Sequence, residues 1–548
     1  MTKIDRRAGK LPDASMLTDI PNLIDAYYAR HPDPDIAAQR VSFGTSGHRG
    51  SALDSAFNED HILAITSAIC RYRRSQGING PLFIGRDTHA LSEPAFKSAL
   101  EILAGENAET MIDAADGYTP TPAISHAILV YNKGRSTGLA DGIVITPSHN
   151  PPTDGGFKYN PPSGGPADTD VTKTIQDMAN QILEEKLRGL NRILYEKAKI
   201  APCIHRHDYI GSYIDDLINV VDMDAIAGSK VRIGIDPLGG AAIGYWQPII
   251  ERYKINATIL NTQVDPTFRF VPVDHDGKIR MDCSSPFVMT KVLESKDKYD
   301  VSFANDTDAD RHGIVCASGL MQPNYYLATC IHFLRTHREH WPKTSGVGKT
   351  IVSSSMIDRV AAALGVKLYE VPVGFKYFVE GLKQTSLFFG GEESAGSSFL
   401  RRDGTVWTTD KDGLIAGLLA AEITAKSGKD PAKLYKDITK NMGESFYDRI
   451  DQPASEAQKS VLGKVQASAV KAESLGGDTV TAKLTNAPGN NLPFGGVKLV
   501  TENGWFAARP SGTEEIYKIY AESFKSADHL KSIQNDAQAI VGRIFAGG

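Results

Sequence analysis

Two hydrophobic periods alternate along most of the chain. Ile62, Ile65 and Ile69 recur at helical spacing, and the short apolar run that follows at 81–85 is typical of a buried strand. A second helix is predicted over 93–103, after which the chain reaches another apolar run at 142–145. Helices that alternate with strands in this way predict an α/β fold.

The same rhythm starts again twice. Apolar strands are predicted at 231–236 and 301–304 in a second unit, and at 350–353 and 387–389 in a third. Each unit closes on a strand that is followed at once by a polar loop. Since ligands bind at the ends of strands in such sheets, we expect these loops to line one pocket.

The C-terminal part of the chain has a different pattern. Apolar runs at 497–501 and 505–509 flank an Asn-Gly turn dipeptide, which is a strong hairpin signal. A third strand is expected over 516–521 and a helix over 527–544. This part is therefore predicted to form a small separate α+β domain.

Composition and charge narrow the function classes. The 548-residue chain is too long for one hydrophobic core, and its 41% hydrophobic and 23% charged content is that of an ordinary soluble protein. The formal charge of -5 provides no cationic excess that would attract nucleic acid. The most apolar helical stretch, 414–421, is too short to cross a membrane. Neither nucleic acid nor a membrane is therefore an expected partner.

Cysteine usage and the N-terminus bear on localisation. The five cysteines contain no CxxC pair, which favours buried thiols in a reducing compartment over a disulfide scaffold or a zinc site. The charged N-terminal residues are not followed by an apolar segment, so a secretory signal is not expected. These features predict a cytoplasmic protein.

A serine stands in a proline-bracketed loop directly after the apolar run at 142–145. In the string Thr-Pro-Ser-His-Asn-Pro, Ser148 carries a hydroxyl that the strand end would place in a cleft. A turn serine and a phosphoacceptor both fit, whereas a Ser-His-Asp hydrolase would require nucleophile-elbow glycines that are absent. A phosphoserine needs cations nearby, and His149 and Lys158 could supply positive charge or protons.

Three aspartates, Asp306, Asp308 and Asp310, alternate in the loop after the strand at 301–304. Alternate residues of an extended loop point the same way, so the carboxylates can converge on a hard cation, and Mg²⁺ completed by a serine phosphate suits them. An EF-hand would need glycine in place of Arg311, and aspartyl-phosphatase loops typically have Thr or Val in place of Asp310. A solvated acidic turn is the remaining alternative.

Two further loops suit a sugar and a phosphate. Glu392 and Ser394 match the hydroxyls of a sugar, although helix capping explains the string equally well, and Lys376 could meet a phosphate or lie at the surface. After the hairpin, a guanidinium, two hydroxyls and backbone N–H groups form a phosphate cradle, for which an ordinary turn is the alternative. The cradle residues are Arg509, Ser511, Gly512 and Thr513.

Read together, these strings resemble the α-D-phosphohexomutase superfamily, and they occur in the same order along the chain as in that family. The resemblance extends from about residue 41 to the C-terminus. The matching strings are 43–50 (FGTSGxRG), 146–151 (TASHNP, with Pro147 for alanine), 306–311 (DGDxDR, with Thr307 for glycine), 392–394 (the sugar loop) and 509–514 (RPSGTE). The Gly-Glu-Glu-Ser form of the sugar loop is similar to phosphoglucomutases, with Ala395 as a small departure. Phosphomannomutase/phosphoglucomutases typically carry GEMS there, and phosphoglucosamine mutases GEQS.

The resemblance implies three similar mixed α/β domains around a central cleft and a smaller C-terminal α+β domain. A short helix is expected near 22–30, and 441–454 is predicted to connect the third and fourth domains. The predicted division is an N-terminal extension (1–40), domain 1 with the phosphoserine loop (41–205), domain 2 with the metal loop (206–322), domain 3 with the sugar loop (323–441) and the C-terminal phosphate-binding domain (442–548).

The implied activity is that of a Mg²⁺-dependent intramolecular phosphotransferase of the isomerase class. α-D-Glucose 1-phosphate and glucose 6-phosphate would interconvert through phospho-Ser148 and a glucose 1,6-bisphosphate intermediate, which also acts as activator. The resemblance implies that Mg²⁺ is bound by Ser148, Asp306, Asp308 and Asp310. It implies that His149 and Lys158 act as acid and base, and that Arg49 and Arg311 orient the phosphoryl group. The implied substrate-binding residues are Lys376, Glu392, Ser394, Arg509, Ser511, Gly512 and Thr513.

Three rival functions stay open at this point. A phosphomanno- or phosphoglucosamine mutase differs only in the preferred sugar. A non-catalytic phosphosugar-binding relative would carry damage to a chemical motif, and the sequence has none. A Mg²⁺-dependent phosphatase would release inorganic phosphate steadily. The expected partner is a small phosphosugar, and the expected assembly is a monomer or homodimer.

Overall fold

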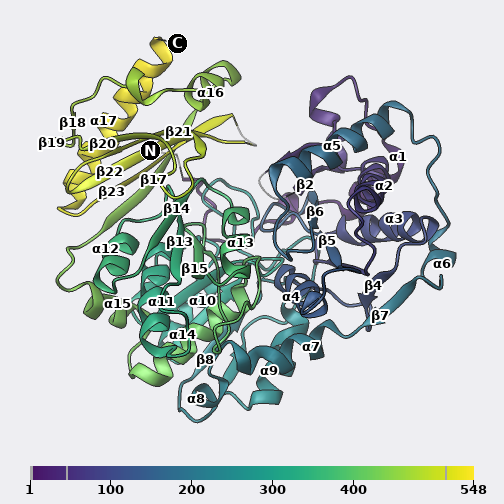
Figure 1. Cartoon of the computed structure of the whole chain (residues 1–548), viewed down its shortest axis with the longest axis horizontal. Helices are drawn as coiled ribbons and strands as arrows, with labels where there is room; N and C mark the ends of the chain where they lie inside the picture. The colour runs from purple at the N-terminus through teal and green to yellow at the C-terminus, as the bar shows by residue number, and fades with distance from the viewer. Residues whose placement is uncertain (1–3, 45–46, 513–514, 548) are drawn as a thin grey trace.

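The computed structural model describes residues 4–44, 47–512 and 515–547. In Figure 1 the C-terminal domain (yellow) and domain 1 (purple to blue) form two separate lobes, and domains 2 and 3 (teal to green) lie below and between them. Three mixed α/β units and an antiparallel C-terminal unit confirm the predicted fold class. Among the described residues, no helix is long and apolar enough to cross a membrane.

The N-terminal extension spans two domains. Its helix α1 (Ile20–Ala29) is capped by the Asp19 side chain and buries Leu23 and Tyr27 in the core of domain 1. The preceding segment bonds instead to domain 2, where the backbone N–H of Gly9 donates to the Val273 carbonyl at 2.8 Å. The helix predicted near 22–30 is therefore present, and the extension links the first two domains.

Domain 1 is built on a mixed sheet with strand order β1-β2-β6-β5-β3-β4-β7. The strands β3, β4, β5 and β7 run parallel, whereas β6 returns antiparallel beside β5. The predicted helices at 62–72 and 93–103 and the strand at 81–85 are all present. The elements are β1 (Phe43–Gly44), β2 (Gly47–Ser51), α2 (Glu59–Ser75), β3 (Leu82–Arg86), α3 (Ser92–Gly105), β4 (Thr110–Asp113), α4 (Thr121–Asn132), β5 (Asp141–Ile145), β6 (Asp154–Asn160), α5 (Thr169–Glu184), α6 (Tyr195–Ala198) and β7 (Ile204–His207).

Domains 2 and 3 repeat this plan with smaller sheets, ordered β12-β11-β10-β8-β9 and β14-β13-β15-β16. In each, parallel strands are followed by one antiparallel return strand, β11 or β16. Domain 2 contains α7 (Tyr209–Asp216), α8 (Met223–Ala227), β8 (Ile233–Asp236), α9 (Ile243–Tyr253), β9 (Ala257–Ile259), α10 (Thr290–Glu294), β10 (Val301–Asn305), β11 (His312–Cys316) and β12 (Gly319–Leu320). Domain 3 contains α11 (Pro323–His337), β13 (Gly346–Thr350), α12 (Met356–Ala363), β14 (Leu368–Val371), α13 (Val379–Lys383), β15 (Leu387–Glu392), β16 (Gly396–Phe399), α14 (Gly413–Ser427) and α15 (Pro431–Thr439).

The C-terminal domain has an antiparallel sheet with strand order β17-β23-β22-β21-β20 and the helix α17 against one face. The predicted hairpin, third strand and terminal helix are all present. Its elements are β17 (Phe446–Pro453), α16 (Glu456–Gly463), β18 (Ser474–Leu475), β19 (Asp478–Thr479), β20 (Ala482–Asn486), β21 (Pro493–Val500), β22 (Gly504–Pro510), β23 (Ile516–Ser523) and α17 (Ala527–Ala546).

Two predicted elements are wrong. The segment 441–454 is more than a connector, because β17 within it pairs along its whole length with β23 as an edge strand. The third unit begins on a strand at Gly346–Thr350, and the predicted strand at 350–353 is a turn. Gly348 makes that strand possible, since a Cβ there would lie 2.5 Å from the Phe378 ring.

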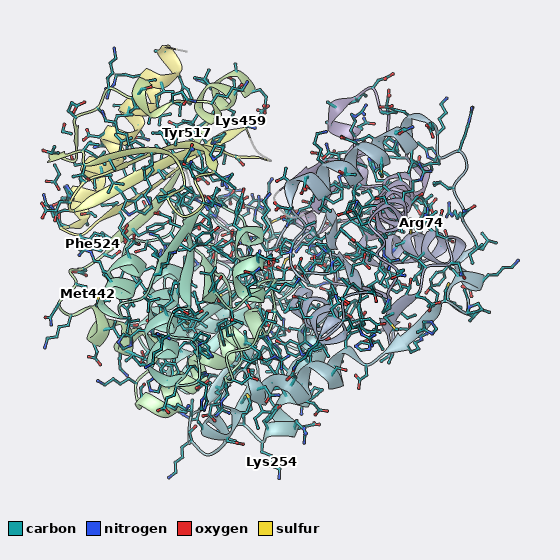
Figure 2. The ribbon with its side chains drawn as sticks, in the orientation of Figure 1. Arg74, Lys254, Met442, Lys459, Tyr517 and Phe524 are labelled. Atoms are coloured by element: carbon teal, nitrogen blue, oxygen red, sulfur yellow. The ribbon has the colours of Figure 1, made fainter. Side chains whose placement is uncertain are left out.

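The seam between domain 3 and the C-terminal domain contains a cluster of polar groups around the buried Glu522. Glu522 on β23 accepts hydrogen bonds from the Ser355 N–H at 2.7 Å, the Ser445 hydroxyl at 2.5 Å and the Trp505 indole at 2.7 Å, as well as from the Ser354 hydroxyl. Beside it, the Arg359 guanidinium covers the Phe524 ring and donates to the Met442 carbonyl, at the junction marked by these last two labels in Figure 2.

Removal of this buried acceptor should loosen the C-terminal domain. Glu522→Ala leaves several donors without a partner, so we expect a loss of about 3 kcal/mol or more in the stability of that domain. Differential scanning calorimetry should show a lower transition temperature for the variant. The exposed Glu502→Gln should leave it unchanged, and an unaltered transition for Glu522→Ala would contradict this assignment.

Candidate active site

A cleft of about 1510 Å³ is lined by all four domains. The three α/β domains contribute loops at equivalent places, because each loop joins the last parallel strand to its antiparallel neighbour: 146–153, 306–311 and 393–395. The C-terminal domain, which carries Tyr517 in Figure 2, closes the remaining side with β22 and β23. The predicted site residues that line the cleft are Arg49, His149, Lys158, Asp310, Arg311, Glu392, Ser394, Arg509 and Gly512.

The Ser148 hydroxyl points at the aspartate loop. Its Oγ donates to Asp306 Oδ2 at 2.8 Å and lies 3.3 Å from Nδ1 of His149. Ser148 is buried and adopts a left-handed backbone with φ of 59°, which costs a non-glycine residue about 1–2 kcal/mol. The strained backbone of Ser148 therefore places its hydroxyl directly beside the carboxylates.

The three aspartates form a compact buried group. One oxygen from each of Asp306, Asp308 and Asp310 lies within 4.8 Å of the other two. Among the described residues, Oδ1 of Asp308 and Oδ1 of Asp310 have no hydrogen-bond partner although both are buried. Burial, together with the charges of its two neighbours, raises the pKa of Asp306 well above its ordinary value. Unpartnered carboxylate oxygens that repel one another fit a hard divalent cation.

Cationic side chains from two other domains approach this group. Nζ of Lys158 lies 2.7 Å from Asp308 Oδ2 on the domain 1 side. From domain 3, Nζ of Lys411 lies 3.0 Å from Asp310 Oδ2 and 3.8 Å from Glu392 Oε2. Burial alone would raise the pKa of Asp310, but Lys411, Lys158 and Arg311 outweigh it and lower that pKa far below its ordinary value.

His149 and the two arginines occupy the rim of the serine loop. Burial, reinforced by Arg311, lowers the pKa of His149 to about 3, so the imidazole is neutral at physiological pH and one of its ring nitrogens can accept a hydrogen bond. Arg49 lies on β2, where Nη1 contacts Asn150 Oδ1 at 3.3 Å. Nε of Arg311 is 3.7 Å from Asp310 Oδ1 and 3.9 Å from Asp306 Oδ2.

The sugar loop meets the metal loop through the backbone. The His312 N–H donates to the Ala395 carbonyl at 3.1 Å, and Ala395 itself has a left-handed φ of 68°. Glu392 accepts from the Gly374 N–H at 3.1 Å, and burial raises its pKa. Lys376 is not among the residues that line the cleft, although its neighbour Phe375 is, and its ammonium contacts Asp168 at 3.5 Å and the Thr169 hydroxyl. Its phosphate role stays a prediction.

The predicted phosphate cradle follows β22. Arg509 and Gly512 line the cleft, Ser511 is buried, and Thr513 lies outside the described residues. The neighbouring strands present two further cations to the same cleft, Lys518 directly opposite Arg509 and Arg449 on β17. These three cations outnumber the one carboxylate, Asp451, that the same strands bring to the cleft lining, where it lies 3.1 Å from Arg449.

Several residues of the site escaped sequence reasoning. Thr121, at the start of α4, donates its hydroxyl to Asp308 Oδ2 at 2.5 Å and its N–H to the Asp308 carbonyl at 3.0 Å. Lys411 stands in a string, Asp-Lys-Asp-Gly, whose density of charge directly before the apolar first half of a helix was an available signal. Lys518 and Arg449 lie in ordinary alternating strands, where no local signal separates them from surface cations.

Domain families match almost the whole chain. Residues 40–186, 211–319 and 322–442 match the phosphoglucomutase/phosphomannomutase alpha/beta/alpha domains I, II and III, and 461–539 match the C-terminal domain of the same group. The chain belongs to the phosphoglucomutase/phosphomannomutase family. The phosphohexomutase resemblance predicted from the sequence is thus confirmed.

Individual relatives agree with this membership. The chain is 61% identical over 547 residues to a phosphoglucomutase of Komagataeibacter xylinus, covering 100% of this chain and 99% of that protein. A putative phosphomannomutase from Thermus thermophilus superposes with a TM-score of 0.72 at 24% identity, covering 93% of this chain and 100% of the other. The open form of parafusin from Paramecium gives 0.72 at 20% identity over 94% and 96% of the two chains. The structural likenesses establish the shared fold.

The carboxylate cluster predicts a measurable response to metal. Mg²⁺ should raise the unfolding temperature of the protein, because an ion that binds only the folded state stabilises it. Asp306→Asn should abolish that shift without lowering the metal-free unfolding temperature, since it removes one of three mutually repelling charges. Asp236→Asn, a buried carboxylate of the same domain outside the cluster, should keep the shift. Equal Mg²⁺ shifts in wild type and Asp306→Asn, measured by differential scanning fluorimetry, would exclude this metal site.

Proposed function

We propose that the chain is a phosphoglucomutase that interconverts α-D-glucose 1-phosphate and glucose 6-phosphate through a phosphoserine at Ser148. The observation that carries the proposal is the 2.8 Å contact between the Ser148 hydroxyl and Asp306, inside a cleft built by four domains. The 61% identity to a phosphoglucomutase over the whole chain supports the choice of glucose. The left-handed serine, the carboxylates and the cations of the C-terminal sheet are together suited to phosphoryl transfer.

Transfer starts from phospho-Ser148. A free hydroxyl of the sugar attacks the phosphorus, the bond from phosphorus to Ser148 Oγ breaks, and the hydroxyl proton passes to a base. Glucose 1,6-bisphosphate forms and reverses its orientation in the cleft. It then returns its other phosphoryl group to Ser148. Mg²⁺ held by Asp306, Asp308, Asp310 and the serine phosphate would supply compensating charge to the transferring group.

The acid and base candidates differ in surroundings. Neutral His149 lies 3.3 Å from Ser148 Oγ, which suits it to receive or return the proton of that oxygen. Lys158 lies against Asp308 and is the second candidate, while Lys411 sits between the metal loop and Glu392 of the sugar loop. We assign Arg49 and Arg311 to the orientation of the transferring group.

Both isomers must bind in the same cleft in opposite orientations. We assign Glu392 and Ser394 to the sugar hydroxyls, and Arg509, Ser511, Gly512 and Thr513 to the phosphate that is not reacting. Closure of the C-terminal domain over the substrate would exclude water, which otherwise hydrolyses the phosphoserine. The cytoplasmic location and the monomeric or homodimeric state stay predictions.

A direct assay separates this function from its rivals. The purified protein, primed with glucose 1,6-bisphosphate and Mg²⁺, should convert glucose 1-phosphate faster than the 1-phosphates of mannose or glucosamine. Steady release of inorganic phosphate would identify a phosphatase instead. Preference for another sugar would overturn the assignment to glucose.

Replacement of the acceptor tests the phosphoserine. Ser148→Ala should lose mutase activity while folding normally, because it removes the oxygen that accepts the phosphoryl group and leaves the rest of the loop unchanged. Intact-mass spectrometry of the wild type should show one added phosphoryl group after treatment with glucose 1,6-bisphosphate, and none in the variant. Ser67→Ala, a buried serine of α2, serves as the matched control. Substantial turnover by a cleanly purified Ser148→Ala would refute the mechanism.

The cationic cradle should act on binding. Arg509→Ala removes a charge-assisted contact worth about 1.5–3 kcal/mol, so we expect KM for glucose 1-phosphate to rise about 10- to 100-fold. Arg543→Ala, on the C-terminal helix of the same domain, should leave KM as it is. Steady-state kinetics over a range of substrate concentrations measure both variants, and an unchanged KM for Arg509→Ala would remove that residue from the site.

A further inference from the structure

The turn between β3 and α3 is buried although it is rich in polar residues. Asp87, Thr88, His89 and Ser92 are all nearly inaccessible to solvent. Because β3 and β5 are adjacent parallel strands, their carboxyl ends bring this turn beside the phosphoserine loop, and the Asp87 N–H donates to the Ile145 carbonyl at 3.0 Å. The acid/base scheme above does not use any of these side chains.

Asp87 is the centre of the turn. Its carboxylate accepts from the His89 N–H at 3.0 Å, from His89 Nδ1 at 2.8 Å and from the Ser92 hydroxyl at 2.6 Å. A fourth donor comes from the next strand, since the Thr146 hydroxyl donates to Asp87 Oδ2 at 2.7 Å. A buried carboxylate with this many donors is held in one place.

Thr146 connects the fixed Asp87 carboxylate to the nucleophile Ser148. Its Oγ1, whose proton is directed at Asp87, accepts the Ser148 N–H at 2.8 Å. Ser148 is the left-handed residue of the loop, and its N–H needs an acceptor on this side if the hydroxyl is to reach Asp306. This series of hydrogen bonds, from Ser148 to Thr146 and from Thr146 to Asp87, thus sets the direction of the reacting oxygen.

His89 fixes the other side of the same loop. Its Nε2 lies 3.0 Å from the Asn150 carbonyl, while Nδ1 faces Asp87. Both ring nitrogens meet acceptors, so the ring donates from both and is cationic. Residues before and after Ser148 are therefore tied to one turn.

The turn also touches domain 2 next to the metal loop. The Thr88 hydroxyl donates to the Gly239 carbonyl at 2.8 Å, and the His89 ring lies 5.1 Å from that of Phe268. Two residues after Gly239, the Ala241 N–H donates to the carbonyl of Thr307 in the metal loop at 2.7 Å. Gly240 permits this approach, because a Cβ there would lie 2.6 Å from the Thr307 Cα.

We propose that Asp87 and His89 are positioning residues, which hold the Ser148 hydroxyl against the aspartate loop by way of Thr146 and the Asn150 carbonyl. The inference rests on the proposed mutase function for its kinetic consequence, but its geometric content is independent of that function. A structural role alone would lower stability, whereas a positioning role lowers the rate of phosphoryl transfer at unchanged substrate affinity.

Thr146 offers the sharpest variant. Thr146→Val keeps the shape and removes the hydroxyl, and we expect kcat to fall about 10- to 100-fold with KM for glucose 1-phosphate unchanged. Thr146→Ser keeps the hydroxyl and should recover most of the loss. Thr110→Val, a buried threonine of β4 whose hydroxyl donates to the Ala108 carbonyl, is the matched control and should retain the wild-type kcat. Wild-type kcat in Thr146→Val, or a rise in KM alone, would overturn the proposal.

Asp87→Asn and His89→Gln test the turn itself. Both should lower kcat and the rate at which glucose 1,6-bisphosphate phosphorylates Ser148, which intact-mass spectrometry follows over time. A crystal structure of Asp87→Asn should show Ser148 outside the left-handed region or its Oγ withdrawn from Asp306; an unmoved Ser148 with wild-type kinetics would refute the inference. If the wild type lacks mutase activity, the proposed function fails, and the crystal structure still decides the positioning role.

Discussion

The structure depends on the burial of three like charges at one strand end. Asp306, Asp308 and Asp310 are buried, and mutual repulsion and lost hydration would destabilise them unless positive charge comes from elsewhere. That charge comes from separate domains, with Lys158 from the first and Lys411 from the third. The packing of the domains against one another is therefore tied to the electrostatics of the cluster.

The repeated α/β plan explains how distant segments reach this pocket. In each of the first three domains the loop that carries chemistry joins a parallel strand to its antiparallel return strand, so equivalent positions face the same centre. Backbone contacts then lock the loops together. Ala395 of the sugar loop accepts from His312, and Asp308 accepts from the Thr121 N–H of domain 1. The site is thus a junction of strand ends.

The C-terminal domain is attached differently. Its sheet contributes Arg509, Lys518 and Arg449 to the cleft. It is joined to domain 3 by the buried cluster around Glu522, by the Lys498 ammonium, which donates to the Ile351 carbonyl at 2.8 Å, and by an apolar cluster that includes Val352 and Trp505. A domain that is attached to one neighbour and faces the open cleft is suited to bind a phosphate, cover the substrate and then release it. The nucleophile and the three aspartates lie in the first two domains, away from this attachment.

Sequence by itself determined the elements whose signal is local. The helical spacing at 62–69, the hairpin around 497–509 and the strings around Ser148 and Asp306 each follow from neighbouring residues, and the structure has these elements where they were expected. Tertiary structure decided what depends on distant partners. The strand β17 is an edge strand whose ladder bonds come from β23, and β13 is glycine-rich because Phe378 packs against it, so neither had a local strand signal. Thr121 and Lys411 became part of the site only when domains 1 and 3 met the aspartate loop of domain 2, and Asp87 only when β3 paired with β5. Their neighbours in the sequence do not show which charge or hydroxyl each of them will face.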